Sequence, residues 1–103
     1  MSTELTRETI QRAVGEWGEQ TFPHASPASI VVGLQCEVEE LARAVESGTS
    51  FSAEEEMANC YLLLLHLAHR SDVDLVEAGA AKFIVNKQRT WDPPDADSVS
   101  GHD

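Results

Sequence analysis

Basic residues are scarce in this sequence. Only 7 of the 103 residues are Lys or Arg, against 18 that are Asp or Glu, so the formal net charge is −11. Duplex nucleic acid and anionic membrane surfaces attract basic patches, which a chain this acidic can hardly provide. We therefore expect neither nucleic acid nor a membrane as a partner.

Aromatic residues, cysteine pairs and long apolar runs are also lacking. Aromatics make up 6% of the chain although 42% of it is hydrophobic, which favours a helical core of Leu, Ala and Val. Cys36 and Cys60 form no C-x-x-C motif, and we expect both to be buried thiols. No apolar run could span a bilayer and no signal peptide opens the chain, so we expect a cytoplasmic protein.

Helical periodicity is the main pattern that is present. Apolar residues recur at helical spacing in four segments, at about 3–21, 27–48, 52–70 and from 72 or 74 to 89. Gly15 and Gly18 are expected to weaken the end of the first helix. Ser26 and Pro27 are typical of an N-cap and a first helical position, and Gly48 is typical of a helix end.

The third predicted helix combines a start signal with an apolar centre. Ser52 and Glu55 have the spacing of a capping box. Residues 61–68 are apolar all round, which is typical of a helix buried on every side. A chain of this length can hardly bury such a helix alone, so we expect a homo-oligomer, either a homodimer or a dimer-of-dimers tetramer, with this helix near the shared core.

The predicted architecture is all-α, a four-helix-type bundle in a single domain at residues 1–91. Asp92, Pro93 and Pro94 should stop the fourth helix. Residues 92–103 are acidic and contain Pro, Gly and Ser, so we expect a disordered tail.

Two polar pairs at helical spacing are the best candidate for chemistry. Glu37 and Glu40 lie three residues apart beside an apolar stripe, and so do Glu56 and Asn59 on the next helix. Packed together, these helices would gather three carboxylates and one amide oxygen, a ligand set suited to Mg²⁺ or Mn²⁺. The competing interpretation is two solvated helix faces, which becomes less favourable when both pairs border the core.

A basic face and a set of aromatic residues are further candidates. Lys82, Asn86 and Arg89 step by four and three residues, so they share a helix face that could clamp phosphates or simply place cations at a helix end. Four residues with aromatic side chains could line a nucleobase pocket, namely Trp17, Phe22, His24 and Trp91. Trp17 could equally pack in the core.

Other chemistries have little support. Cys60, His66 and His69 could suggest zinc, but no second ligand pair has suitable spacing. No Gly-rich phosphate loop and no serine nucleophile motif occur.

The ordered set of motifs resembles the MazG-like all-α NTP pyrophosphatase superfamily. The matching segments are 37–41, 55–59, 74–75 and the basic face, in the family order E-x-x-E, E-x-x-D and a basic last helix. Residues 16–27, together with Asn86, Arg89, Thr90 and Trp91, are similar to the phage and bacterial dATP/dGTP diphosphohydrolase branch, which includes the MazZ enzymes. The resemblance covers roughly residues 10–95.

The resemblance implies an enzyme that converts dGTP or dATP and water to the monophosphate and pyrophosphate. Its metal would be Mg²⁺ or Mn²⁺, held by Glu37, Glu40, Glu56 and Asn59. Lys82 and Arg89 would balance charge on the leaving group, and Asn86 would bind phosphate or sugar. Trp17, Phe22, His24 and Trp91 would lie on the base and sugar side. The compartment would be the bacterial cytoplasm, or the host cytoplasm if a phage encodes the chain.

Asn59 departs from the family pattern, which has Asp at this position. An amide can coordinate through its oxygen, but it carries no charge and cannot take up a proton at neutral pH. One metal could suffice, Glu55 could substitute, or the protein could bind nucleotides with weak or no catalysis. A helical interaction module with solvated acids is a third interpretation. The preferred base, the number of metals and the physiological role, whether pool sanitation or precursor supply for a modified genome, stay open.

Overall fold

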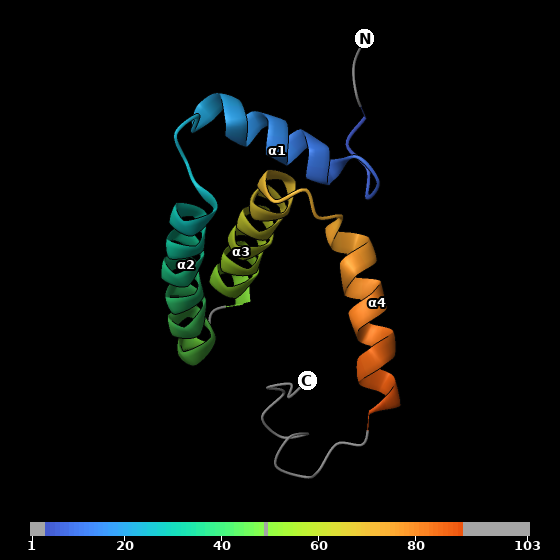
Figure 1. Cartoon of the computed structure of the whole chain (residues 1–103). Coiled ribbons are helices and arrows are strands. Elements are labelled where there is room, and N and C mark those ends of the chain that lie inside the picture. The colour runs from blue at the N-terminus through green and yellow to red at the C-terminus, as the bar shows by residue number, and fades with distance from the viewer. Residues whose placement is uncertain (1–3, 49, 90–103) are drawn as a thin grey trace.

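The computed structural model describes residues 4–48 and 50–89, and these form four α-helices without a strand (Figure 1). The helices are α1 (Ile10–Thr21), α2 (Pro27–Ser47), α3 (Ser50–Arg70) and α4 (Leu75–Gln88). The prediction of an all-α fold is confirmed. Trp91 and the proposed tail at 92–103 lie outside the described residues. In the described part of the chain, no helix combines the length and the apolar character needed to cross a membrane.

Local sequence signals account for the ends of α2 and the start of α4. The Ser26 side chain accepts a hydrogen bond from the Ser29 backbone N–H at 3.1 Å, and Pro27 takes the first helical position. Gly48 ends α2 at a φ of 74°, a left-handed conformation that glycine adopts without strain. Asp74 caps α4 by accepting from the Glu77 N–H at 3.1 Å.

Two predicted helix starts were wrong. The first helix begins at Ile10 rather than near residue 3, because Thr6 and Thr9 hydrogen-bond to each other and form a turn before it. The third helix begins at Ser50, so Ser52 lies inside α3 and is no N-cap. The capping-box spacing alone did not mark the helix start.

The core lies where α1 crosses α3 and where α2 packs alongside α3 (Figure 1). Among the described residues, the buried apolar side chains are Ile30, Ala44, Leu65 and Ala68. Gly15 and Gly18, which were expected to weaken α1, lie buried inside it. The helix continues through both glycines to Thr21, and they let α1 approach α3 closely.

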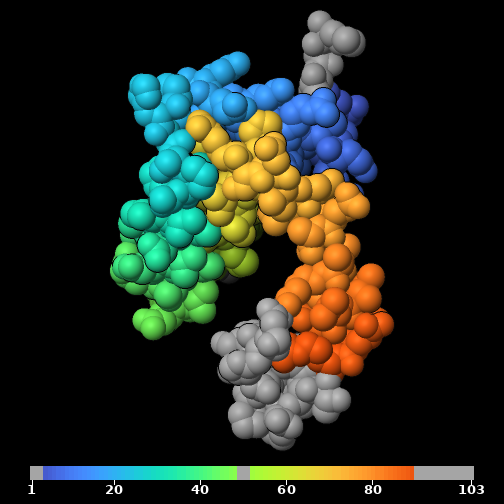
Figure 2. Space-filling view, viewed as in Figure 1, coloured from blue at the N-terminus to red at the C-terminus, as the bar shows by residue number. Residues whose placement is uncertain are grey.

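The fourth helix stands away from the other three. It makes only marginal contact with them, and Figure 2 shows an open space between α4 and α2. Gln11 of α1 bonds to the start of this helix: its Nε2 donates to the Val73 carbonyl at 2.6 Å, and its Oε1 accepts from the Leu75 N–H at 3.1 Å. Within this chain α1–α3 form the packed unit, and α4 extends from it.

Several apolar side chains are exposed as a result. Tyr61, Leu62 and Leu64 of α3 are all exposed, so a single chain does not bury this helix on every side; its burial in a homo-oligomer stays a prediction. Phe83 and Ile84 of α4 are 63% and 56% exposed. Cys36, predicted to be buried, is exposed too, while Cys60 is half-buried.

Candidate functional site

A pocket of about 670 Å³ opens between α1, α2 and α3 and joins two of the predicted clusters. Trp17 and Phe22 line one part of it, and Glu37 and Asn59 line another. The rest of the wall is mostly small or apolar and consists of Ala13, Val14, Ala25, Ser29, Ile30, Gly33, Leu62, Leu63 and His66. The volume is within the range of small-molecule sites, and the lining combines an apolar body with a few polar groups.

The acidic end of the pocket is built by facing side chains of α2 and α3. The neighbouring Glu56 carboxyl raises the pKa of Glu37 above its ordinary value through a hydrogen bond, with desolvation and the negative charge of Glu56 adding to this. A hydrogen bond from Asn59 to Glu37 lowers the pKa of Glu37 and so offsets part of this increase. The structure thus places the side chains of Glu37, Glu56 and Asn59 close together.

Glu40 points to a different partner. Its carboxylate accepts from Arg43 Nη2 at 2.7 Å in an ion pair whose side chains are 53% and 63% exposed. In this conformation the four predicted ligands are not all assembled, and the residues at 4–48 and 50–89 contain no group of three His, Cys, Asp or Glu side chains arranged to hold a metal ion. An exposed ion pair contributes only about 0–1 kcal/mol, so this pair itself opposes a rotation of Glu40 toward Glu37 only weakly.

The donor set at this end nevertheless fits a hard divalent cation. Glu56 Oε2 is buried and has no hydrogen-bond partner, although a carboxylate oxygen removed from water normally has one. Glu37 and Glu56 face each other, and a cation between them would relieve their repulsion. Burial, and then the negative charges of the same two acids, raise the pKa of the Cys60 thiol.

The aromatic end of the pocket lies where α1 meets the loop to α2. The ring centroids of Trp17 and Phe22 are 5.6 Å apart, and the two ring planes are nearly perpendicular, at 85°. Both are about half exposed, at 57% and 50%, so neither is a core residue. His24 is also exposed, but it does not line the pocket. The structure therefore brings Trp17 and Phe22 to the pocket and leaves His24 outside it.

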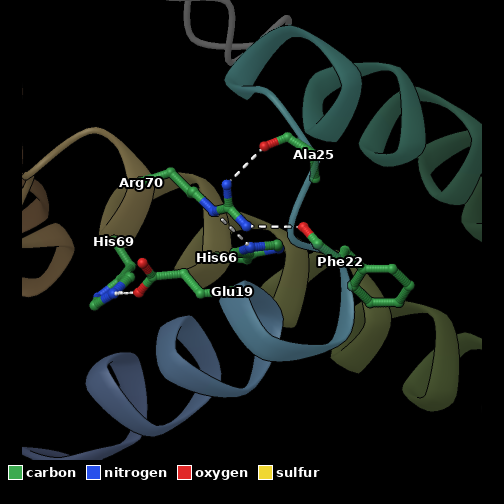
Figure 3. A network of polar contacts seen from close by, with 6 residues as sticks. All are labelled: Glu19, Phe22, Ala25, His66, His69 and Arg70. Atoms are coloured by element: carbon green, nitrogen blue, oxygen red, sulfur yellow. Dashed lines mark hydrogen bonds and ion pairs between the residues drawn. The ribbon is translucent and has the colours of Figure 1, made fainter.

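Arg70 holds the loop that carries Phe22, and the sequence analysis missed this residue. Its Nη1 donates to the Ala25 carbonyl at 2.7 Å and its Nη2 to the Phe22 carbonyl at 2.9 Å (Figure 3). Its Nε donates to His66 Nε2 at 3.3 Å. The i, i+4 spacing of His66 and Arg70 was the available signal, but nothing local connected Arg70 to a loop 45 residues earlier.

Two glycines let α1 approach the histidines of α3. A methyl group on Gly18 would lie 2.5 Å from His66 Nε2, and one on Gly15 would overlap the His69 ring. Beside them, His69 Nε2 and Glu19 Oε1 pair at 2.5 Å (Figure 3). These contacts fix the position of α1, and with it the Trp17 side of the pocket.

The basic face does not reach the pocket within one chain. Lys82, Asn86 and Arg89 share a face of α4 by their spacing, but none of them lines the pocket. Because α4 makes only marginal contact with α1–α3, the predicted phosphate clamp and the acidic end stay apart.

Comparison with known proteins gives a limited picture. No protein-family model matches the chain, and no solved structure matches it. A protein of Salmonella phage PMBT28 named dATP/dGTP diphosphohydrolase is 29% identical over 82 residues, which cover 80% of this chain and 27% of that protein. The chain thus spans about a quarter of the length of this relative, and it is similar to that part of a phage nucleotide diphosphohydrolase.

Proposed function

We propose that this chain is a metal-dependent pyrophosphohydrolase of purine deoxynucleoside triphosphates, releasing the monophosphate and pyrophosphate. One observation carries the proposal: a single pocket has the Trp17–Phe22 pair at one part of its wall and Glu37 and Asn59 at another. Aromatic faces bind a base, and a carboxylate cluster binds the cation that accompanies phosphates. The similarity to a phage dATP/dGTP diphosphohydrolase supports the same class.

The residues divide the work along the pocket. Trp17 and Phe22 would bind the base by stacking and exclude water from that side. Glu37, Glu40, Glu56 and Asn59 would hold Mg²⁺ or Mn²⁺, which when bound neutralises phosphate charge and lowers the pKa of a coordinated water. One of these glutamates would take up a proton from the attacking water.

The direct test is product analysis. The purified protein is incubated with dGTP, dATP, dCTP and dTTP in turn, with Mg²⁺ or Mn²⁺, and nucleotides and pyrophosphate are separated by ion-exchange chromatography. We expect monophosphate and pyrophosphate in equal amounts from the purines. Release of single phosphates, or no product from a folded sample, would refute the proposal.

Self-association is part of the proposed function, because it would bring α4 to the acidic end of a second copy. Phe83, Ile84 and Val76 of α4 are 63%, 56% and 67% exposed, and the helix presents them beside a basic face. Burying such side chains is favourable by about 1.5–3 kcal/mol each. Lys82 and Arg89 of one copy would then face the negative charge of Glu37 and Glu56 of another.

Complementation between inactive copies tests this arrangement. Glu56→Gln and Arg89→Ala proteins are each expected to be inactive, and their co-refolded mixture should regain about a quarter of wild-type activity if a two-fold dimer shares its sites. Light scattering after size exclusion gives the oligomeric state. A monomer at micromolar concentration, or a mixture as inactive as its components, would show that α4 does not act in trans.

A nucleotide-binding protein without turnover is the second candidate, favoured by Asn59 in the pocket wall. The amide leaves the site one negative charge short of the family pattern. Calorimetry that detects purine nucleotide binding without product would favour this candidate. Gain of activity in Asn59→Asp would then identify the amide as the cause.

A further inference from the structure

The pocket contains a buried histidine to which the proposed function gives no role. His66 is 6% exposed and lines the pocket. It follows Asn59 by seven residues on α3, so the two side chains leave nearly the same face of the helix, roughly 10 Å apart along its axis. Asn59 belongs to the acidic end, and His66 therefore lies toward the aromatic end, next to the loop of Phe22.

Arg70 determines which nitrogen of this ring carries the proton. A guanidinium group can only donate hydrogen bonds, and Arg70 Nε donates to His66 Nε2 at 3.3 Å. Nε2 must therefore accept, which leaves the proton of the neutral ring on Nδ1. The Ala25 and Phe22 carbonyls hold Arg70 itself in place, as Figure 3 shows.

The surroundings of the ring favour its neutral form and pack closely against it. Burial, and then the positive charge of Arg70, lower the pKa of His66, with His69 acting in the same direction and Glu19 of α1 opposing them. Gly18 of α1 packs so closely that a methyl group there would lie 2.5 Å from Nε2. His66 is thus a fixed hydrogen-bond donor in a mostly apolar pocket.

We propose that the Nδ1–H group of His66 donates a hydrogen bond to N7 of a bound purine and so selects purines over pyrimidines. N7 is an acceptor in both adenine and guanine, and pyrimidines have no ring-nitrogen acceptor at that edge. A site built to hydrogen-bond one group of its ligand discriminates strongly against ligands that lack it. Trp17 and Phe22 give stacking, which every base satisfies, so the choice of base needs a directed polar group of this kind. This inference rests on the proposed function and names how its substrate is recognised.

The test compares dGTP with 7-deaza-dGTP, in which N7 is replaced by a C–H group. For the wild type we expect kcat/KM about five- to tenfold lower for 7-deaza-dGTP, mainly through KM, as the loss of one hydrogen bond implies. His66→Leu should lose a similar factor with dGTP and no longer distinguish the two substrates. His66→Gln retains an N–H donor and should recover part of the discrimination. Circular dichroism and thermal melting verify that each variant is folded.

A second measurement needs no variant. Long-range ¹H–¹⁵N spectra of the wild-type protein report the tautomer of His66, and we expect the proton on Nδ1. Adding dGMP should shift the Nδ1 resonance, whereas 7-deaza-dGMP should leave it nearly unchanged.

The outcomes separate the two proposals. Equal use of dGTP and 7-deaza-dGTP by the wild type, or a proton on Nε2, would overturn the role of His66 and leave the hydrolase proposal intact. Absence of both binding and hydrolysis for every purine nucleotide would overturn both. Discrimination that survives unchanged in folded His66→Leu would assign N7 recognition to another residue and refute this inference.

Discussion

Replacing Gly18 by alanine should destabilise the protein, although alanine is the better helix former. Gly18 lies inside α1, and its added methyl group would meet three atoms of the His66 ring at 2.5–2.7 Å. Carbon and nitrogen atoms in ordinary contact are about 3.5 Å apart. The ring cannot move away easily, because it is buried and Arg70, one turn later on α3, donates to its Nε2 at 3.3 Å.

Two opposing effects determine the size of the change. Alanine in place of glycine favours a helix by about 1 kcal/mol. Overpacking in a closely packed contact is unfavourable by about 1–3 kcal/mol, and the immobile ring places Gly18 at the upper end of this range. We expect the free energy of unfolding to fall by about 1–2 kcal/mol, which for a domain of this size lowers the melting temperature by about 4–16 °C.

Gly79 gives a matched control. It lies inside α4, and a methyl group there would meet nothing within 4 Å, so Gly79→Ala should stabilise the chain by about 0.5–1 kcal/mol. Urea unfolding followed by far-ultraviolet circular dichroism measures both variants. A double-mutant cycle of Gly18→Ala with His66→Ala should show strong coupling. The reasoning is refuted if Gly18→Ala is as stable as Gly79→Ala, or if the cycle shows no coupling.

Three further predictions concern the pocket. The pKa of His66 is lowered in the folded protein, so the unfolded chain binds more protons at low pH. The free energy of unfolding should therefore fall as the pH decreases below about 6.5, which urea titrations at several pH values would measure. The folded variant His66→Gln should lose this part of the pH dependence. Glu37→Gln removes one of two facing acids, so it should raise the melting temperature without metal at pH 7 and abolish the increase that we expect Mn²⁺ to give the wild type. Asn59→Asp should strengthen Mn²⁺ binding in calorimetry, and unchanged affinity would exclude this residue as a ligand.

The sequence predicted best what depends on neighbouring residues. Ser26, Pro27 and Gly48 define the ends of α2 through their own backbone chemistry, and these ends are confirmed. Glu37 and Asn59 each belong to a polar pair with i, i+3 spacing, one pair on α2 and the other on α3. Because these two helices pack side by side, Glu37 comes close to Asn59.

What the sequence could not predict depends on contacts between distant segments. Glu40 is an exception, because it pairs with Arg43 only three residues later on its own helix, and this local pair competes with Glu37 and Glu56 for the same carboxylate. Arg70 acts on carbonyl groups of a loop far earlier in the chain, and backbone acceptors leave no trace in a sequence pattern. From the sequence, Gly18 is expected only to weaken the helix, because its contact with the His66 ring is visible only in the folded structure.

The amide of Gln11 has a mechanical consequence. It bonds to the Val73 carbonyl and the Leu75 N–H, acting as a substitute peptide group between α1 and the start of α4. The fourteen residues of α4 form a lever about 21 Å long that pivots at this amide. A rotation of only about 10° at the pivot displaces the far end by about 4 Å, more than the length of a hydrogen bond. One uncharged side chain on the helix of Trp17 thus helps to set the direction in which α4 leaves the packed helices.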